Sequence, residues 1–354
     1  MNNRVTLSSG EDLTIRMIEP PLRAYTDKVG CWLEVRDDLL SGNLTPWLFT
    51  PYFVGEIDGK LVGSMSYYVH TEKRSIGVVE FVQTGESHRG KGIANALMHR
   101  LIKRFRKDGG QALYLCTNNP IAGHLYERHG FSYHVGDGMR YLAPDFLQFD
   151  ETYWRNCGEA VVRNATWGDL PALSALYNHP EPNWLIKDYL TSSFSETRYE
   201  SHFVKVMRRI ENGRGSFSVL ENPKGNVVGA AAIERKDTFV EQHVGTLGFR
   251  ITPEYESQLG ELLLDVEDRA RSISIRTLQI PMASCDHHQC ELVRAAGFEE
   301  EVRLKDRLRL EEGYVDLLVF GKTTTDTVKP FREVDSYYGT RKKWQAKRAR
   351  SLSL

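Results

Sequence analysis

The chain has 354 residues, of which 41% are hydrophobic and 26% are charged, and its 46 basic and 47 acidic side chains leave a net charge of -1. At roughly 100–200 residues per domain, this length predicts two domains, each long enough to bury a core of its own. The balanced charge excludes a polyanion binder that is basic throughout, and the hydrophobic content excludes a disordered acidic chain.

The sequence also indicates the cellular compartment. It contains no run of 18 apolar residues, so we expect no membrane-spanning helix, and its N-terminus lacks the apolar region of a secretory signal. Five cysteines without the spacing of a disulfide framework predict free thiols and a cytoplasmic protein; they are Cys31, Cys116, Cys157, Cys285 and Cys290. The segment 285–290 holds two cysteines and two histidines, but its spacing matches no common zinc pattern, so we predict no metal site.

The first half of the chain alternates strand and helix patterns. Asp58-Gly59 lies between two runs rich in β-formers and predicts a hairpin turn. Apolar residues at helical spacing after Gly92 predict a helix that Gly109 ends. We expect strands at 13–18, 52–57, 60–69, 76–84, 112–116, 131–135 and 139–142, and helices within 21–41 and at 92–107 and 120–129.

The same order of elements recurs in the second half. We expect strands at 160–163, 216–220, 227–233, 244–251, 278–280, 303–308 and 314–320, and helices at 170–177, 199–210, 257–270 and 290–296. The fold class is therefore α/β, with two tandem domains that each contain a mixed, mostly antiparallel sheet flanked by helices. The predicted boundaries are 1–145 for the first domain, 146–159 for a connector, 160–322 for the second domain and 323–354 for a C-terminal extension.

A glycine-rich turn joins a strand to a helix at residues 82–94. Glycine lets the backbone approach a ligand closely, and the first amides of a helix carry the positive end of its dipole. Such a turn forms a cradle for an anion such as a pyrophosphate, and Arg89 and Lys91 add positive charge. The turn is neither a Walker A loop nor a Gly-x-Gly-x-x-Gly motif.

Two motifs carry a resemblance to a known family. Arg89-Gly90-Lys91-Gly92-Ile93-Ala94 resembles the Arg/Gln-x-x-Gly-x-Gly/Ala loop of the GNAT superfamily of acyl-CoA-dependent N-acyltransferases. The later run from Asn119 through Ala122 and Tyr126 to Gly130-Phe131 is similar to the second signature of that family. The two motifs stand in the family's order, and the resemblance covers residues 10–142.

The resemblance implies an acetyl-CoA site. It implies that the backbone of Val82, Gln83 and Thr84 pairs with the pantetheine amides and that Asn119 contacts the pantetheine arm. It implies that Tyr126 lies beside the thioester sulfur and protonates the leaving thiolate. The residues that match the pyrophosphate loop are Arg89, Gly90, Lys91, Gly92, Ile93 and Ala94.

The chemistry requires a base as well. An amine must lose a proton, with an unperturbed pKa of about 10, before it attacks a thioester. Glu80 is the carboxylate on the strand that precedes the loop, and strict alternation would place it on one face with Val82 and Thr84. His70 and Glu72 are weaker candidates, and His88 and His129 fit surface or packing roles. The alternative roles are that of a packing residue for Tyr126 and that of a surface or substrate-orienting acid for Glu80.

The second half departs from the pattern at the positions that matter. Aligned with the first half, it has Glu256 at the position of Arg89, Leu259 at that of Gly92 and Val293 at that of Tyr126, and Glu261 matches Ala94. Carboxylates would repel a pyrophosphate, and leucine would fill the space that glycine leaves. We therefore predict a degenerate GNAT-like domain that closes the acceptor side of the first domain or forms a dimer interface.

The functional hypothesis is an acetyl-CoA-dependent N-acetyltransferase that acetylates a primary amine of a small molecule, with Glu80 as base and Tyr126 as acid. A protein or peptide N-acetyltransferase and a non-catalytic CoA-binding sensor are the alternatives. No membrane and no nucleic acid is expected as a partner, and the protein is a monomer or a homodimer. A basic run at 340–350 is a solvated end or a contact for an anionic partner.

Overall fold

The computed structural model describes residues 4–186 and 199–324. The basic run and most of the predicted C-terminal extension lie outside the described residues. Within them, the helices are too short or too polar to span a bilayer.

The N-terminal sheet has the strand order β1-β2-β4-β5-β6-β7-β9-β8, with β3 paired to β5. Strands β6 and β7 pair in parallel, and the other described neighbours in this sheet are antiparallel. The strands are β1 (Arg4–Thr6), β2 (Asp12–Ile18), β3 (Leu48–Phe49), β4 (Tyr52–Ile57), β5 (Lys60–His70), β6 (Ile76–Thr84), β7 (Ala112–Cys116), β8 (Phe131–Val135) and β9 (Gly138–Leu142). The α-helices are α1 (Arg36–Ser41), α2 (Ile93–Lys107) and α3 (Pro120–Glu127), followed by α4 (Phe149–Tyr153) in the connector.

The C-terminal sheet repeats this plan in the order β10-β11-β12-β13-β14-β16-β15, which matches β2-β4-β5-β6-β7-β9-β8 strand for strand. Here too the central pair, β13 and β14, is parallel. The strands are β10 (Val161–Asn164), β11 (Gly215–Glu221), β12 (Val227–Arg235), β13 (Val244–Ile251), β14 (Thr277–Ala283), β15 (Glu299–Leu310) and β16 (Gly313–Thr323). The helices are α5 (Leu170–Tyr177), α6 (Tyr199–Glu211), α7 (Leu259–Ser272) and α8 (His287–Ala295). The predicted fold class, two tandem α/β domains, is confirmed.

Local sequence signals account for many of these elements. Asp58 and Gly59 both adopt positive φ in the β4–β5 turn, as an Asp-Gly hairpin requires. Helix α2 buries Ile93, Leu97 and Leu101 against the sheet and ends before Gly109, whose φ is +87°. The connector, in which the sequence predicted no helix, contains α4, because its aromatic residues are buried and hold it against the fold.

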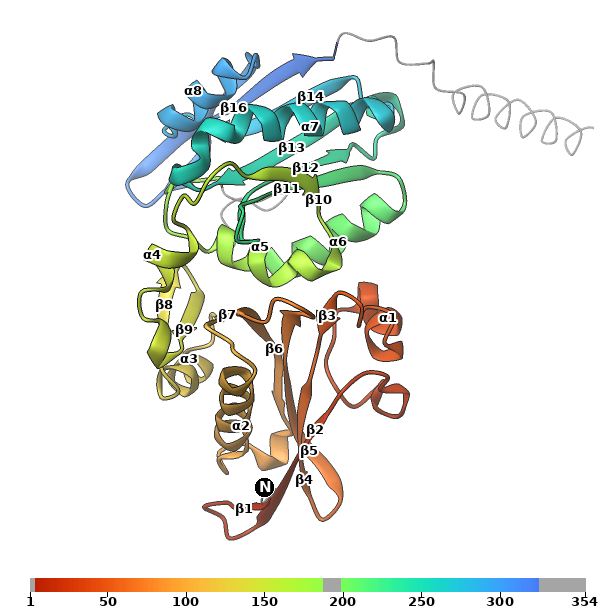
Figure 1. Ribbon diagram of the computed structural model, residues 1–354, viewed down its shortest axis with the longest axis vertical. Coiled ribbons are helices and arrows are strands. Elements are labelled where there is room, and N and C mark those ends of the chain that lie inside the picture. The colour runs from red at the N-terminus through yellow and green to blue at the C-terminus, as the bar shows by residue number, and fades with distance from the viewer. Residues whose placement is uncertain (1–3, 187–198, 325–354) are drawn as a thin grey trace, which may run out of the picture.

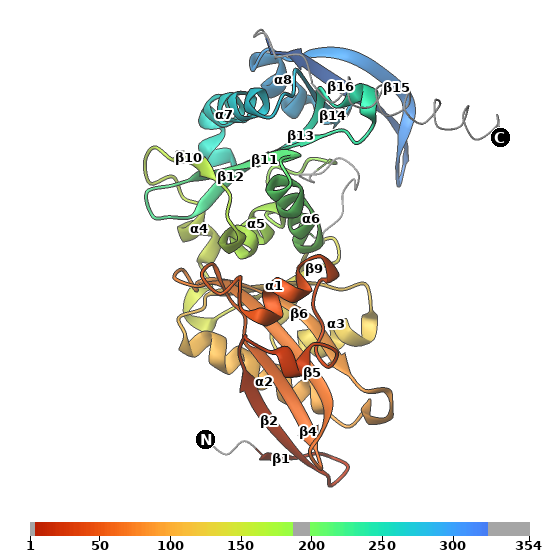
Figure 2. The same ribbon diagram turned by 90° about the vertical axis from the view of Figure 1, so that its right-hand side faces the viewer.

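The two halves do not bury separate cores, contrary to the sequence-based expectation. One apolar cluster lies between the N-terminal sheet and helices α2 and α3. The other cluster joins residues of the opposite face of that sheet, such as Tyr68 and Val78, to the interior of the second domain. Figures 1 and 2 show α5 and α6 between the two sheets, and Leu173 of α5 is fully buried there.

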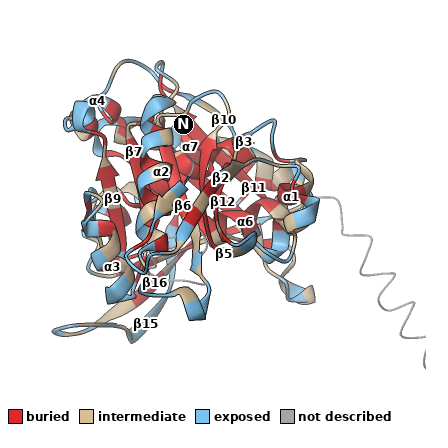
Figure 3. Cartoon of the chain, turned by 90° about the horizontal axis from the view of Figure 1, so that it is seen from below, coloured by how far each residue is buried: buried red, intermediate tan, exposed pale blue. Residues whose placement is uncertain are grey.

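The burial of the strands follows from this arrangement. Figure 3 shows buried strands through the centre of both domains and exposed outer faces on the helices, while the long strand β15 is largely exposed. Helix α5 therefore serves as a cover for both sheets, because it contacts β5 and β6 on one side and β12 and β13 on the other.

Candidate active site

Strand β6 carries an irregularity at its centre. Phe81 adopts a φ of +54°, and the register with β5 shifts between Ser64 and Ser66, which pair with Gln83 and Glu80. One extra residue in β6 is a β-bulge, and a bulge breaks the alternation of side chains. The prediction that Glu80, Val82 and Thr84 share one face is therefore wrong: Val82 packs with the α2 cluster, as Val79 does across the bulge.

Strands β6 and β7 separate toward the bulge. They pair only from Ile76 to Val78 with Ala112 to Tyr114, although both strands continue beyond these residues. Past Val78, the backbone groups of β6 on this side have no β7 partner in the ladder. These groups are positioned to form hydrogen bonds with a ligand inserted between the strands.

The loop after β6 has the geometry of an anion cradle. Gly90 and Gly92 have φ angles of +78° and +88°, and a Cβ atom at either position would meet no atom within 4 Å. Gly92 is the N-cap of α2, and no side chain caps the first amides of this helix. The start of α2 therefore offers N–H groups and a positive dipole end to a ligand that approaches the glycines.

Two cationic residues flank this cradle. Arg89 is exposed, with its nearest carboxylate, Glu86, at 3.8 Å. Lys91 pairs with Glu11 of the β1–β2 turn at 2.9 Å, so part of its charge is already compensated. Arg89 is thus the cation of the loop that is more available to an incoming anion.

Asn119 and Tyr126 lie on α3. The side-chain oxygen of Asn119 accepts hydrogen bonds from the backbone amides of Ile121 and Ala122, at 3.0 and 3.4 Å, and so caps the helix. This cap uses the oxygen and not the amide nitrogen of Asn119. Tyr126 is only 6% exposed and packs on Phe131, with ring centroids 5.9 Å apart.

The structure brings Tyr126 near Glu80. Burial raises the pKa of the Tyr126 phenol to about 12, and the charge of Glu80 adds to this effect. The phenol is therefore protonated at neutral pH, as a proton donor must be. Glu80 is half-buried, at the bulge where the two strands begin to separate.

The histidines and the second carboxylate considered from the sequence lie elsewhere. His70 accepts hydrogen bonds from the amides of Glu72 and Lys73 at the far end of β5. It is four residues along β5 from Ser66, the partner of Glu80, which is about 13 Å at the rise of a strand. His88 contacts the Ser87 hydroxyl, and His129 links α3 to Asn95 of α2 at 3.0 Å. These four residues therefore have structural contacts of their own.

An aromatic cluster on the opposite face of β6 was missed in the sequence. Trp32 lies 4.8 Å from Tyr68 and 5.1 Å from Phe81 between ring centroids. Nearby, Gly30 approaches the Gln83 side chain so closely that a Cβ atom would lie 2.7 Å from its amide nitrogen. No short sequence motif predicts this cluster, because its members come from three separate segments that are brought together by the tertiary structure.

Comparison with known proteins gives the family. Residues 22–131 match the family model described as the acetyltransferase (GNAT) family. This part of the chain is a GNAT acetyltransferase domain. Acetyl-CoA is the co-substrate of that family.

Solved GNAT structures resemble about half of the chain. A ribosomal-protein-alanine N-acetyltransferase from Brucella melitensis is 24% identical, with a TM-score of 0.39, over 46% of this chain and 99% of its own. A phosphinothricin acetyltransferase from Sinorhizobium meliloti, in complex with acetyl-CoA, is 18% identical, with a TM-score of 0.42, over 49% of this chain and 97% of its own. No curated protein matches the chain significantly.

The second domain has the strand order of the GNAT domain without its loop. Leu259 is the first residue of α7 and is buried. Glu256 Oε2 lies 2.7 Å from His288 Nε2, so this carboxylate already has a partner. Strand β13 pairs with β12 in unbroken register from Gly245 to Ile251, so the bulge of β6 has no counterpart there.

In the second domain, a protein segment packs on the strand that aligns with β6. Arg250, at the position of Gln83, is fully buried and donates hydrogen bonds to the carbonyl oxygens of Pro182 and His179, at 2.5 and 2.6 Å. Trp184 packs on Phe249, with ring centroids 5.4 Å apart. The segment 179–184 thus covers part of β13.

Proposed function

We propose that the N-terminal GNAT domain transfers the acetyl group of acetyl-CoA to a primary amine of a small molecule. The observation that carries the proposal is the separation of β6 from β7 ahead of the open glycine loop, with Glu80 at the bulge where this separation begins. A base and an acid on the two sides of a thioester are what aminolysis requires.

The donor would bind along β6 and the loop that follows. In this proposal the backbone of Val82, Gln83 and Thr84 holds the pantetheine arm, and the amide nitrogen of Asn119 contacts it from α3. The pyrophosphate occupies the cradle formed by Arg89, Gly90, Lys91, Gly92, Ile93 and Ala94. The open space beside both glycines and the uncapped start of α2 support this assignment.

The reaction would proceed by direct attack. Glu80, directly or through water, takes a proton from the ammonium of the acceptor, and the neutral amine attacks the thioester carbon. Backbone amides at the bulge stabilise the oxyanion. The carbon–sulfur bond then breaks, Tyr126 gives its proton to the departing thiolate, and the second proton of the attacking nitrogen passes through solvent to restore the phenol, so the products are an amide and CoA thiol.

The acceptor would approach the face of β6 that carries the aromatic cluster. Trp32 and Phe81 are half-buried, and their rings offer faces that attract a cation before it is deprotonated. The second domain covers part of this face through α5. A partly covered, aromatic acceptor side supports a small amine over a folded protein substrate, and it gives the degenerate domain, here assigned to residues 160–322, the role of a cover.

A screen of primary amines tests the proposal. Purified protein is incubated with acetyl-CoA and amino acids, amino sugars, polyamines or lysine-containing peptides, and released CoA thiol is measured. We expect release with at least one small amine and none with peptides. Turnover with peptides alone would support the protein acetyltransferase, and CoA binding without turnover by any amine would support the sensor.

A further inference from the structure

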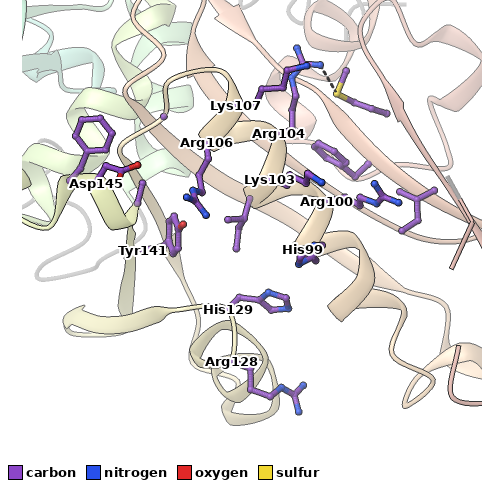
Figure 4. Close-up of a pocket in the computed structure, with 17 residues that line it drawn as sticks. His99, Arg100, Lys103, Arg104, Arg106, Lys107, Arg128, His129, Tyr141 and Asp145 are labelled. Atoms are coloured by element: carbon purple, nitrogen blue, oxygen red, sulfur yellow. Dashed lines mark hydrogen bonds between the residues drawn. The ribbon is translucent and has the colours of Figure 1, made fainter. Parts of the chain in front are cut away.

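A large cavity among the described residues lies outside the proposed catalytic site. It has a volume of about 980 Å³ and lies along the C-terminal half of α2. We call it the α2 basic cavity; it is lined by Ile15, Met17, Phe53, His99, Arg100, Ile102, Lys103, Arg104, Arg106, Lys107, Gly110, Arg128, His129, Tyr141, Ala143, Asp145 and Phe146. Figure 4 shows side chains of α2 and Tyr141 of β9 at this cavity, whereas the side chain of Arg128, in the turn after α3, extends away from Lys103 and Lys107.

The lining of this cavity is strongly basic. Its lining contains six arginine and lysine side chains and one carboxylate, Asp145, whereas the whole chain has 46 basic and 47 acidic residues. Arg104 is paired with Asp108 at 2.7 Å. Among the described residues, no carboxylate forms an ion pair with Lys103, Lys107 or Arg128.

The helix dipole explains part of this concentration of cations. Basic residues complement the dipole in the last turn of a helix. Arg104, Arg106 and Lys107 lie in the last turn of α2 and Arg128 is the C-cap residue of α3, whereas Lys103 lies before the last turn. Lys103 therefore adds positive charge beyond what the dipole accounts for, as expected beside a bound anion.

The floor of the cavity is apolar and aromatic. Ile15 and Phe53 of the sheet are buried beneath it, Tyr141 is 6% exposed, and Phe146 at the rim is 36% exposed. The volume falls at the upper end of the range of about 300–1,000 Å³ that is usual for small-molecule sites. A ligand that fits has several negative charges and a flat or apolar body.

We propose that the α2 basic cavity binds a nucleoside polyphosphate, with the phosphates on Lys103 and Lys107 and the base against the aromatic floor. Lys103 is eleven residues from Gly92, about 16 Å along the helix, so this site is separate from the proposed pyrophosphate cradle. An RNA strand fits less well, because the basic lining is confined to one cavity and the chain as a whole is not basic.

Binding of ATP in the presence of saturating CoA tests this proposal, because CoA then fills the proposed catalytic site, whether or not that site catalyses a reaction. We expect ATP to bind more tightly than AMP, with an affinity that falls as salt is added. Inorganic triphosphate should bind more weakly than ATP, because it lacks the base.

The double variant Lys103→Glu/Lys107→Glu should weaken ATP binding by about tenfold or more, since two charge-assisted contacts with the phosphates are lost. Both side chains are exposed, so the fold should survive, and a thermal unfolding curve checks this. Lys60→Glu, at an exposed lysine that begins β5, is the control and should leave ATP binding unchanged.

Several results would overturn the proposal. They are the absence of ATP binding when CoA is bound, an unchanged affinity in the double variant, equal binding of triphosphate and ATP, or tighter binding of a 12-nucleotide single-stranded RNA than of ATP. The last result would assign the cavity to nucleic acid.

Discussion

Glu80 on β6 and Tyr126 on α3 are electrostatically linked: the carboxylate adds to the effect of burial and helps to raise the pKa of the phenol to about 12. The two residues are 46 positions apart in the sequence and lie on different elements of the first domain. A phenol with this pKa holds its proton throughout the physiological range.

The substitution Tyr126→Phe removes that proton and retains the packing on Phe131. We expect kcat to fall by about 10²-fold with little change in KM for acetyl-CoA, because general acid catalysis contributes roughly 10²–10⁴-fold. Steady-state kinetics with the best amine of the screen measures both constants. An unchanged kcat would leave Tyr126 as a packing residue.

The substitution Glu80→Gln removes the proposed base at nearly constant volume. The loss of kcat/KM should be largest at low pH, where the acceptor amine is protonated and needs a base, and should shrink as pH rises toward the amine pKa. Glu72→Gln is the matched control, since Glu72 lies at the far end of β5 and should tolerate the change. A loss of equal size at every pH would instead assign Glu80 to orienting the substrate.

Donor binding should depend on Arg89. Arg89→Glu is preferable to a change at Gly92, because the φ of +88° at Gly92 would strain any larger residue there. We expect KM for acetyl-CoA to rise by about tenfold, with kcat retained and the unfolding temperature unchanged. Arg155→Glu, another exposed arginine, controls for the change in net charge. Calorimetry should give one CoA per chain, and two equivalent sites would contradict the degenerate second domain.

Much of the fold could be predicted because its signals are local. Asp58-Gly59 specifies a hairpin, Gly109 ends α2, and the apolar spacing of Ile93, Leu97 and Leu101 identifies the buried face of this helix. The glycines of the loop likewise carry their own signal, because positive φ is cheap only for glycine.

The remaining features depend on tertiary contacts. The bulge in β6 could not be predicted, because Phe81 has no intrinsic preference for the left-handed region that it adopts. The α2 basic cavity combines segments as distant as Ile15 and Phe146. The shared core could not be predicted either. A strand residue such as Tyr68 gives the same apolar pattern in the sequence whether its own domain or the second domain covers it.

Alkaline pH should destabilise the folded protein. Burial raises the pKa of Tyr114 and of Tyr126 to about 12, above the value of 10 for an exposed tyrosine. Between pH 10 and 12 the unfolded chain loses these protons and the folded chain keeps them, so the free energy of unfolding decreases as pH rises. Urea unfolding at pH 9, 10.5 and 11.5 measures this slope. Tyr114→Phe should make it shallower, and an identical slope would contradict the assignment.

The shared core predicts that both domains unfold together. Leu173 is 1% exposed on α5, in the apolar cluster that joins the second domain to Tyr68 and Val78 of the N-terminal sheet. Leu173→Ala should lower the free energy of unfolding by about 2–5 kcal/mol. Since the lost contacts belong to both halves, scanning calorimetry should show one transition that moves to lower temperature as a unit. Leu264→Ala is the control, because Leu264 is 57% exposed on α7 and its truncation should shift the transition little. Two transitions, of which Leu173→Ala moves only the second, would mean that the N-terminal domain is stable without the cover that α5 provides.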